Sequence, residues 1–320
     1  MKLLNLLLVF VFTTGFCFSQ SLSDSIIKTE TLVKDVNFLA NDSLQGRLMG
    51  SAGADKAAIY ISTRFVAIGL KPLDMNGGFS MPIGNSIGNI VGAIAGKTKP
   101  EEIIVFSAHY DHVGTSDNNQ DYKQIRAIPK KYNDNIYNGA NDNASGVALL
   151  LSLAEYFVKE DANERTIIFI AFTGEEQGFI GSKDFASNIS KPNSFKAVLN
   201  FDMVGRNSYE NSVAYITGSN TNPIIKLLNN TLQQSDKSFK KRFFQSDPFT
   251  GHQLDKRSDH VPFANMGIYA VTMFATAPTD EYYHTVNDEQ QTLNFPFLLK
   301  LTKAVAIAVK SLLIDAELKN

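Results

Sequence analysis

Short apolar runs alternate with amphipathic stretches along most of this chain. Runs rich in apolar and β-branched residues predict strands at 89–95, 103–108, 166–172, 197–201 and 268–274. Apolar residues that recur at helical spacing predict helices at 23–40, 54–68, 147–158, 179–187, 223–233 and 295–313. The stretch 70–86, rich in glycine, proline and asparagine, is predicted to be a loop. This alternation predicts an α/β fold, in which helices sandwich a sheet that is largely parallel in its centre.

Residues 1–19 differ in character from the rest of the chain. Lys2 precedes an apolar run, and Cys17-Phe18-Ser19 supplies a small-x-small cleavage motif. This pattern predicts a signal peptide that is removed after Ser19, so that the protein is exported to the periplasm or the extracellular space. Lipidation of Cys17 is the less favoured alternative, because the residue before it is bulkier than usual. No repeat or linker divides residues 20–320, which are predicted to form a single domain.

The composition excludes several classes of partner. The net charge is −2 and basic residues form no long run, so a nucleic-acid partner is not expected. No stretch after the predicted signal approaches the ~20 apolar residues that a membrane-spanning helix requires. Cys17 is the only cysteine, so removal of the signal would leave a chain without disulfides. No feature of the sequence predicts an oligomeric state.

Polar residues of catalytic or metal-binding type follow two of the predicted strands. His109 and Asp111 follow the strand 103–108, and Glu175 and Glu176 follow the strand 166–172. Residues two apart on an extended segment point the same way, so Asp111 is expected to orient His109 by accepting its second ring N–H. Two adjacent carboxylates after a buried strand are costly to bury unless they are paired or bind metal, although a solvated pair is an alternative.

Three further candidates lie at comparable positions. Asp142 precedes a helix within Gly-Ala-Asn-Asp-Asn-Ala-Ser-Gly, where an aspartate can also be a simple helix cap. Asp202 follows the strand 197–201, and His284 comes after the last strand. Ligands in α/β proteins bind at the carboxyl ends of the strands, where these residues are expected to gather. Imidazole and carboxylate ligands without thiolate are typical of catalytic Zn²⁺, and five such ligands suit two ions if one carboxylate bridges.

These motifs resemble those of the M28 family of co-catalytic zinc peptidases, from Gly46-Arg47-Leu48-Met49-Gly50-Ser51 to the segment of His284 and the final helix. The resemblance implies the phosphorylase/hydrolase-like α/β fold of a zinc exopeptidase, with a central mixed, mainly parallel sheet flanked by helices. It also implies a cis peptide after a bridging Asp142. The catalytic residues implied are Glu175, as general base, and Asp111, as partner of a ligand histidine. Two Zn²⁺ ions would be bound by His109, Asp142, Glu176, Asp202 and His284.

The resemblance also implies a substrate-side loop at Ser258-Asp259-His260-Val261-Pro262-Phe263. Asp259 is expected either to contact substrate or to hold this loop by hydrogen bonds. The remaining histidines are expected to be loop or core residues rather than ligands, namely His112, His252 and His260.

The predicted function is therefore that of a secreted dizinc aminopeptidase, which hydrolyses N-terminal residues from peptide substrates. A carboxypeptidase of the same family and a single-zinc acyltransferase like the glutaminyl cyclases are the alternatives. A non-catalytic binding module is a third reading, which the complete set of ligands argues against.

Overall fold

The computed structural model describes residues 21–73, 78–117, 135–207, 213–218 and 222–314. The described helices are α1 (Leu22–Ile26), α2 (Thr29–Leu39), α3 (Ala52–Ile68), α4 (Ser145–Glu160), α5 (Ile180–Ser187), α6 (Pro223–Ser235), α7 (Val261–Asn265), α8 (Phe295–Ala308) and α9 (Lys310–Ile314). The described strands are β1 (Lys71–Pro72), β2 (Ser80–Ile83), β3 (Ser86–Ile94), β4 (Lys99–His109), β5 (Arg165–Phe172), β6 (Phe195–Phe201), β7 (Ala214–Ile216), β8 (Phe244–Ser246) and β9 (Ala270–Phe274). The predicted signal peptide and the alternative lipidation of Cys17 lie outside the described residues and stay predictions.

All described strands belong to one mixed sheet, in the order β1-β3-β5-β4-β6-β9-β7-β8, with β2 paired to β3. The central strands β5, β4, β6 and β9 pair in parallel. Antiparallel pairing of β3 with β5 and of β7 with β9 flanks this centre. The predicted α/β fold with a mixed sheet and a parallel centre is thus confirmed.

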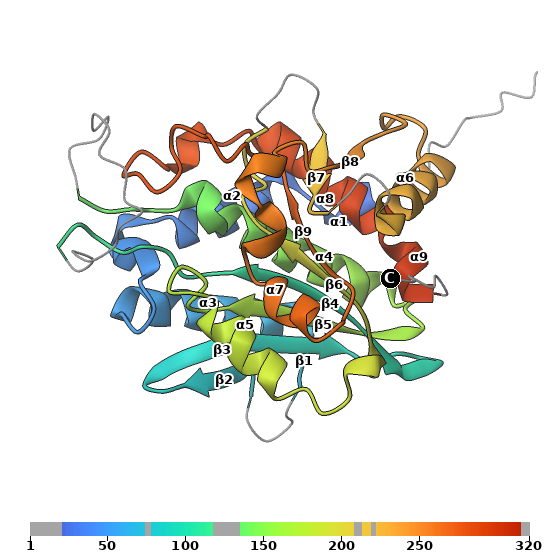
Figure 1. Cartoon of the computed structure of the whole chain (residues 1–320), viewed down its shortest axis with the longest axis horizontal. Coiled ribbons are helices and arrows are strands. Elements are labelled where there is room, and N and C mark those ends of the chain that lie inside the picture. The colour runs from blue at the N-terminus through green and yellow to red at the C-terminus, as the bar shows by residue number, and fades with distance from the viewer. Residues whose placement is uncertain (1–20, 74–77, 118–134, 208–212, 219–221, 315–320) are drawn as a thin grey trace, which may run out of the picture.

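Both faces of the central strands are buried, which explains their continuous apolar sequences. Alternate residues point to opposite faces of a strand. Phe106 and Phe169 therefore join the large core under α4, whereas Val105 and Ile168 join a smaller core under α5 and α7. Figure 1 shows α5 and α7 on the near face of the sheet and α4 on the far face.

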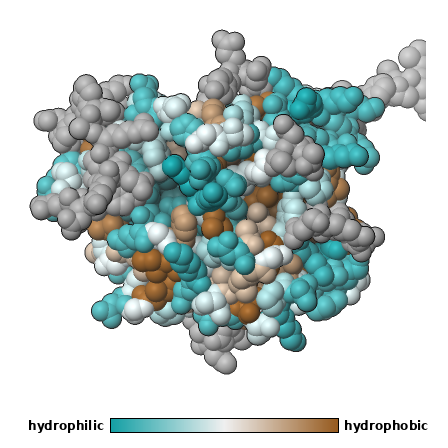
Figure 2. All heavy atoms as spheres, in the orientation of Figure 1, coloured by the Kyte–Doolittle hydropathy of each residue, from teal (hydrophilic) through white to brown (hydrophobic). Residues whose placement is uncertain are grey.

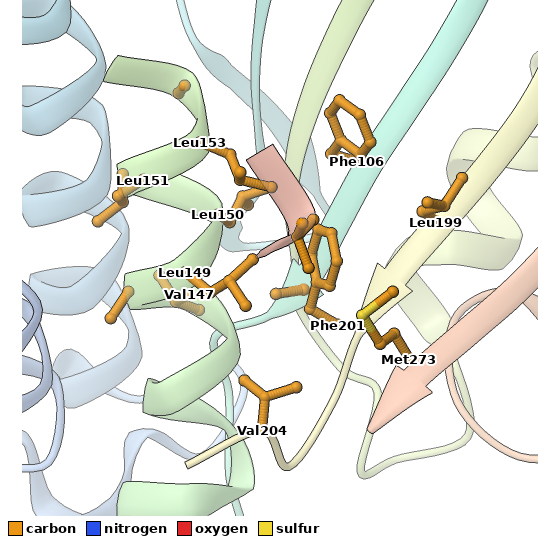
Figure 3. Packing of buried hydrophobic residues seen from close by; sticks show 14 of the residues in the cluster. Phe106, Val147, Leu149, Leu150, Leu151, Leu153, Leu199, Phe201, Val204 and Met273 are labelled. Atoms are coloured by element: carbon orange, nitrogen blue, oxygen red, sulfur yellow. The ribbon is translucent and has the colours of Figure 1, made fainter. Parts of the chain in front are cut away.

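Helix α4 anchors the larger core. Val147, Leu150 and Leu153 point from α4 towards aromatic side chains of the central strands, as Figure 3 shows for Phe106 and Phe201. Phe106 lies centrally in this packing, with ring centroids 6.0 Å from Phe157 and 6.1 Å from Phe201. This packing fixes the start of α4 against the carboxyl ends of β4 and β6, where the candidate site residues lie.

Several predicted elements differ from those observed. The single helix predicted at 23–40 is divided into α1 and α2, because Lys28 between them is extended, with φ −121° and ψ 145°. The single helix predicted at 295–313 is divided into α8 and α9 near Val309. The predicted loop at 70–86 contains the short strands β1 and β2, which exist through pairing with the long strand β3. The strands β7 and β8 were not predicted.

The surface is consistent with the composition. Hydrophilic residues cover most of the face that Figure 2 shows, and apolar residues form small patches in its lower half. In the part of the chain that the structure describes, no helix combines the length and the apolar character needed to cross a bilayer.

Candidate metal centre

The candidate ligands meet at the carboxyl ends of the parallel strands. His109 is the last residue of β4, and it pairs in register with Phe172 at the end of β5. Glu175 and Glu176 follow β5 in a turn before α5, and Asp202 directly follows β6. The register of the sheet therefore brings residues from three strands to one level, as the sequence predicted.

Asp142 joins two groups of ligand-type side chains. One group contains His109, Asp142 and Asp202, and the other contains Asp142, Glu176, His284 and His112, with potential ligand atoms within 4.8 Å of one another in each group. Asp142 Oδ1 lies 3.3 Å from His109 Nε2, and its Oδ2 lies 3.1 Å from His284 Nε2. Each oxygen of this one carboxylate thus faces a different group, which is the arrangement that a bridging ligand requires.

The turn that carries Asp142 has the predicted backbone. The peptide bond between Asp142 and Asn143 is cis, as the resemblance implied. Asp142 is buried, and the side chains of Asn141 and Asn143 beside it are fully buried. Asn141 Oδ1 accepts the backbone N–H of Gly205 (2.8 Å), and Asn143 Nδ2 donates to the carbonyl oxygen of Phe201 (2.8 Å). The two asparagines therefore attach this turn to the segment that carries Asp202.

His112, which was expected to be a loop or core residue, is a member of the site. Its Nδ1 lies 2.8 Å from Glu176 Oε1, while Glu176 Oε2 lies 3.2 Å from His284 Nε2. The His112 ring is fully buried, and its Nε2 has no hydrogen-bond partner among the described residues. His112 is therefore placed either to orient Glu176 or to complete this ligand group. Its position directly after Asp111 was the one signal that could have found it.

Two buried aspartates hold the backbone of the two ligand-bearing turns. Asp111 accepts the backbone N–H groups of Glu175 (3.2 Å) and Glu176 (3.4 Å). Asp288 accepts those of Asn141 (3.0 Å) and Asp142 (3.0 Å). Asp111 is close to His109 as expected, but its backbone carbonyl lies nearer to the ring Nδ1 than its carboxylate does, at 3.2 Å against 3.7 Å. The described contacts thus show Asp111 chiefly as an acceptor for the Glu175 turn.

Asp202 is oriented by a chain of hydrogen bonds that enters from the loop before α7. Ser258 Oγ donates to Asp202 Oδ2 at 2.7 Å and accepts a hydrogen bond from Asn200 Nδ2 at 2.8 Å. Thr272 Oγ1 accepts the second N–H of Asn200 and contacts His260 Nδ1. His260 is therefore a buried structural residue, and burial lowers its pKa to about 4. This network was not visible in the sequence.

Negative charge predominates among the clustered side chains. Burial raises the pKa of Glu175 well above its usual value, and the carboxylates of Glu176 and Asp202 act in the same direction. Burial acts to lower the pKa of His284, but the neighbouring Glu176 and Asp142 raise it to about 10. Asp259 lies fully buried nearby, and burial raises the pKa of its carboxyl group to about 7. A site of this charge favours bound cations.

The acidic side chains open onto a cavity of about 100 Å³. Its described lining contains four carboxylates and one cationic residue, Arg257. The lining residues are Asp142, Glu175, Glu176, Asp202, Met203, Leu254, Arg257, Ser258, Pro278 and Tyr283. Glu175 differs from the other three carboxylates, because no described side chain forms a hydrogen bond or ion pair with it. Its carboxylate thus remains available to a molecule in the cavity.

An α/β fold with two histidine- and carboxylate-lined groups that share one aspartate is the architecture of a metal-dependent hydrolase. The donor atoms, imidazole nitrogen and carboxylate oxygen without thiolate, are of the kind that Zn²⁺ binds in catalytic sites. The family model described as peptidase family M28 matches residues 89–309, which include every candidate ligand. The chain belongs to peptidase family M28.

Individual relatives are distant. Aminopeptidase YwaD of Bacillus subtilis strain 168 is 29% identical over 228 residues, which make up 69% of this chain and 44% of that protein. The chain therefore spans less than half the length of the curated relative that it matches. An aminopeptidase from Aneurinibacillus sp. strain AM-1 superposes with a TM-score of 0.67 at 16% identity, covering 93% of this chain and 97% of that one. A glutaminyl cyclase from Porphyromonas gingivalis superposes with a TM-score of 0.65 at 17% identity, covering 90% of this chain and 99% of that one. These likenesses show the shared fold.

Proposed function

We propose that this chain is a zinc aminopeptidase, which binds two Zn²⁺ ions through His109, Asp142, Glu176, Asp202 and His284. The observation that carries the proposal is the sharing of Asp142 between two ligand groups, with one oxygen facing His109 of the first group and the other facing His284 of the second. The names of the relatives, aminopeptidases and zinc metalloproteases, support the same assignment.

Zinc bound at these groups would polarise the carbonyl of the substrate and lower the pKa of an attacking water. Glu175 lines the cavity beside both groups and is placed to accept a proton from that water. The same carboxyl group then returns the proton to the leaving amine. Asp111 keeps the Glu175 turn in place through its backbone N–H groups.

The acidic lining of the cavity favours substrates with a free α-ammonium group. The four carboxylates that line it supply negative potential next to the point where the scissile carbonyl would lie. A substrate without its amino-terminal charge would lose this attraction. The proposed specificity is therefore for the amino terminus of a peptide.

Metal analysis and a matched substrate series test this proposal. We expect two zinc ions per chain, loss of activity on treatment with a chelator, and restoration by added zinc. We expect cleavage of leucine amide and leucyl-p-nitroanilide, but not of their N-acetylated forms.

A peptide with a free and with an amidated carboxyl terminus, and a peptide with an amino-terminal glutamine, complete the series, so that each alternative has its own outcome. Cleavage that depends on a free carboxyl terminus would replace the proposal with a carboxypeptidase. One tightly bound zinc with cyclisation of an amino-terminal glutamine would favour a glutaminyl cyclase. Absence of both metal and turnover would favour a binding module.

We further propose that the protein is exported, with a signal peptide at residues 1–19 that is removed to leave Gln20 as the first residue. Mass spectrometry of the protein recovered from its native host tests this. A mass increased by an acyl group on Cys17 would indicate a lipoprotein instead, and an intact Met1 would contradict export by cleavage.

A further inference from the structure

Arg257 occupies an unusual position beside the candidate metal centre. It is the only cationic residue in the described lining of the 100 Å³ cavity, whose other charged members are the four carboxylates of the site. It also lines an adjoining cavity of about 70 Å³, together with Leu254, Phe274 and Pro278. Arg257 therefore stands where the acidic cavity meets a mostly apolar one.

The backbone holds Arg257 in this place. Its N–H donates to the carbonyl oxygen of Leu254 at 3.2 Å, and the next residue, Ser258, is buried and bonded to the candidate ligand Asp202. The Cα atoms of consecutive residues are about 3.8 Å apart, so the base of the Arg257 side chain lies one residue from this ligand contact. The residue is thus attached to the site, although its side chain is exposed.

The guanidinium group of Arg257 has no partner within the described part of the protein. No ion pair or side-chain hydrogen bond joins it to a described residue, even though carboxylates line the same cavity. Histidines contact Asp142 and Glu176, and Ser258 donates to Asp202. Glu175 is open towards the cavity. A planar group with five donors and no protein acceptor suits a carboxylate that arrives with the substrate.

We propose that Arg257 binds a carboxylate of the substrate close to the scissile bond, so that this chain prefers short or acidic peptides that carry one. This inference rests on the proposed aminopeptidase function and adds a specificity to it. Two sources offer the same chemistry: the terminal carboxylate of a dipeptide, and the side-chain carboxylate of an acidic first residue. The apolar walls beside Arg257 would contact the methylene groups of such a substrate.

The experiment compares kcat/KM for two matched pairs of substrates. The first pair is the dipeptide leucyl-glycine and its C-terminal amide, and the second is glutamyl-p-nitroanilide and its neutral counterpart, glutaminyl-p-nitroanilide. We expect the wild-type chain to prefer the charged member of at least one pair by about threefold to tenfold, as for an exposed to half-buried ion pair. The pair that shows the preference identifies the source of the carboxylate.

Variants of Arg257 then test whether its side chain causes the preference for the charged substrate. Arg257→Gln should abolish it through KM with kcat unchanged, and Arg257→Lys should retain part of it, because a lysine keeps the charge without the forked donors. Lys256→Gln is the matched control, since it removes the same charge one residue away, at a side chain bonded to Gln253 (3.3 Å). Higher ionic strength should weaken the preference, because the site is exposed.

Three outcomes overturn the inference. Equal kcat/KM within both pairs would do so, and so would a preference that survives in Arg257→Gln or disappears equally in Lys256→Gln. Failure of the proposed function is distinguishable, because the wild-type chain would then cleave neither leucine amide nor the two p-nitroanilides, which have no free carboxyl terminus. A preference for leucyl-glycine over its amide supports the inference only if leucine amide is also cleaved, since a carboxypeptidase would cleave the dipeptide alone.

Discussion

The two turns that carry Asp142 and Glu175, the proposed bridging ligand and the proposed general base, are held in the same manner but to different degrees. The Asp142 loop comprises residues 139–145, and the Glu175 loop comprises residues 173–179. A buried aspartate accepts two consecutive backbone N–H groups from each loop, Asp288 for the first and Asp111 for the second. The bonds to Asp288 are shorter, at 3.0 Å, and Arg206 Nη1 donates to the same carboxylate at 2.7 Å.

The remaining contacts increase the difference. The asparagines of the Asp142 loop bond to the backbone of residues 201–205, and Ser145 Oγ accepts the N–H of Val204 at 3.1 Å. In the Glu175 loop, Gly178 and Phe179 donate to the carbonyl oxygen of Glu175 within the loop itself, and Thr173 N–H donates outside it to Asn89 Oδ1, at a longer 3.2 Å. A bridging ligand must stay fixed between two groups, whereas a general base must reach both an attacking and a leaving group. The Asp142 loop suits the first task, and the Glu175 loop suits the second.

Replacing Glu175 gives the sharpest test of this division. Glu175→Gln should lower kcat by about 10²- to 10⁴-fold, the usual contribution of a general base, because the amide cannot accept the proton. Metal content and unfolding midpoint should match those of the wild-type chain. Steady-state kinetics and elemental analysis measure both. Loss of metal in this variant would mean that the Glu175 loop also supplies a ligand through Glu175.

The two supporting aspartates should differ in their contribution to stability. Asp288→Asn should lower the free energy of unfolding by about 3 kcal/mol, because it leaves the buried charge of Arg206 with Asp280 as its remaining ion-pair partner. Asp111→Asn should lower it by about 1–3 kcal/mol, the range for hydrogen bonds that lose a charged acceptor. Urea unfolding of the two metal-free variants measures the difference. Equal losses would show that the two loops are held equally firmly.

Glu176 should behave as a ligand although it is adjacent to the proposed general base, Glu175. Glu176→Gln should weaken metal binding, because it removes a negatively charged ligand from the group of Asp142, Glu176, His284 and His112. The loss of affinity should exceed the ~10–100-fold that is typical when a residue hydrogen-bonded to a ligand is replaced. Competition with a coloured chelator measures the affinity. If Glu175→Gln and Glu176→Gln retain zinc equally and lose equal activity, the assigned roles are wrong.

The positions of the five longest described strands (β3, β4, β5, β6 and β9) and of most candidate ligands could be predicted, because both depend on local patterns. The apolar run before Glu175 indicates a strand buried on both faces, and residues directly after such strands meet at one edge of the sheet. The residues that orient the ligands could not be found in this way. Asp288 bonds to Asp142 across 146 positions, and Ser258 bonds to Asp202 across 56. Such contacts depend on the complete fold rather than on spacing.

The missed strands have the same origin. The strands β7 and β8 are three residues long, which is too short for the sequence pattern to indicate a strand, and their pairing in the sheet defines them. His112 was underrated for a different reason. A histidine next to an aspartate in a turn has no periodic signal. His112 is connected to the site by tertiary contacts, namely its 2.8 Å contact with Glu176 and the packing of its ring against His284, with ring centroids 5.6 Å apart.

The smallest predicted effect concerns Asp202, the fourth carboxylate of the site, which belongs to neither loop. Ser258→Ala removes the hydroxyl group that donates to Asp202, and it leaves one N–H of the buried Asn200 without an acceptor. The variant should therefore lose about 1–2 kcal/mol of unfolding free energy. Its metal affinity should fall roughly tenfold, because Asp202 is no longer oriented by a hydrogen bond. Alanine fits the backbone as well as serine does at φ 71°, so the change isolates the hydroxyl group. Ser152→Ala is the control, because the buried Ser152 Oγ has no hydrogen-bond partner among the described residues and lies on α4 within the core. It should leave metal affinity unchanged. If Ser258→Ala binds metal as tightly as Ser152→Ala does, the loop before α7 does not orient Asp202, and that carboxylate is held by the strand end alone.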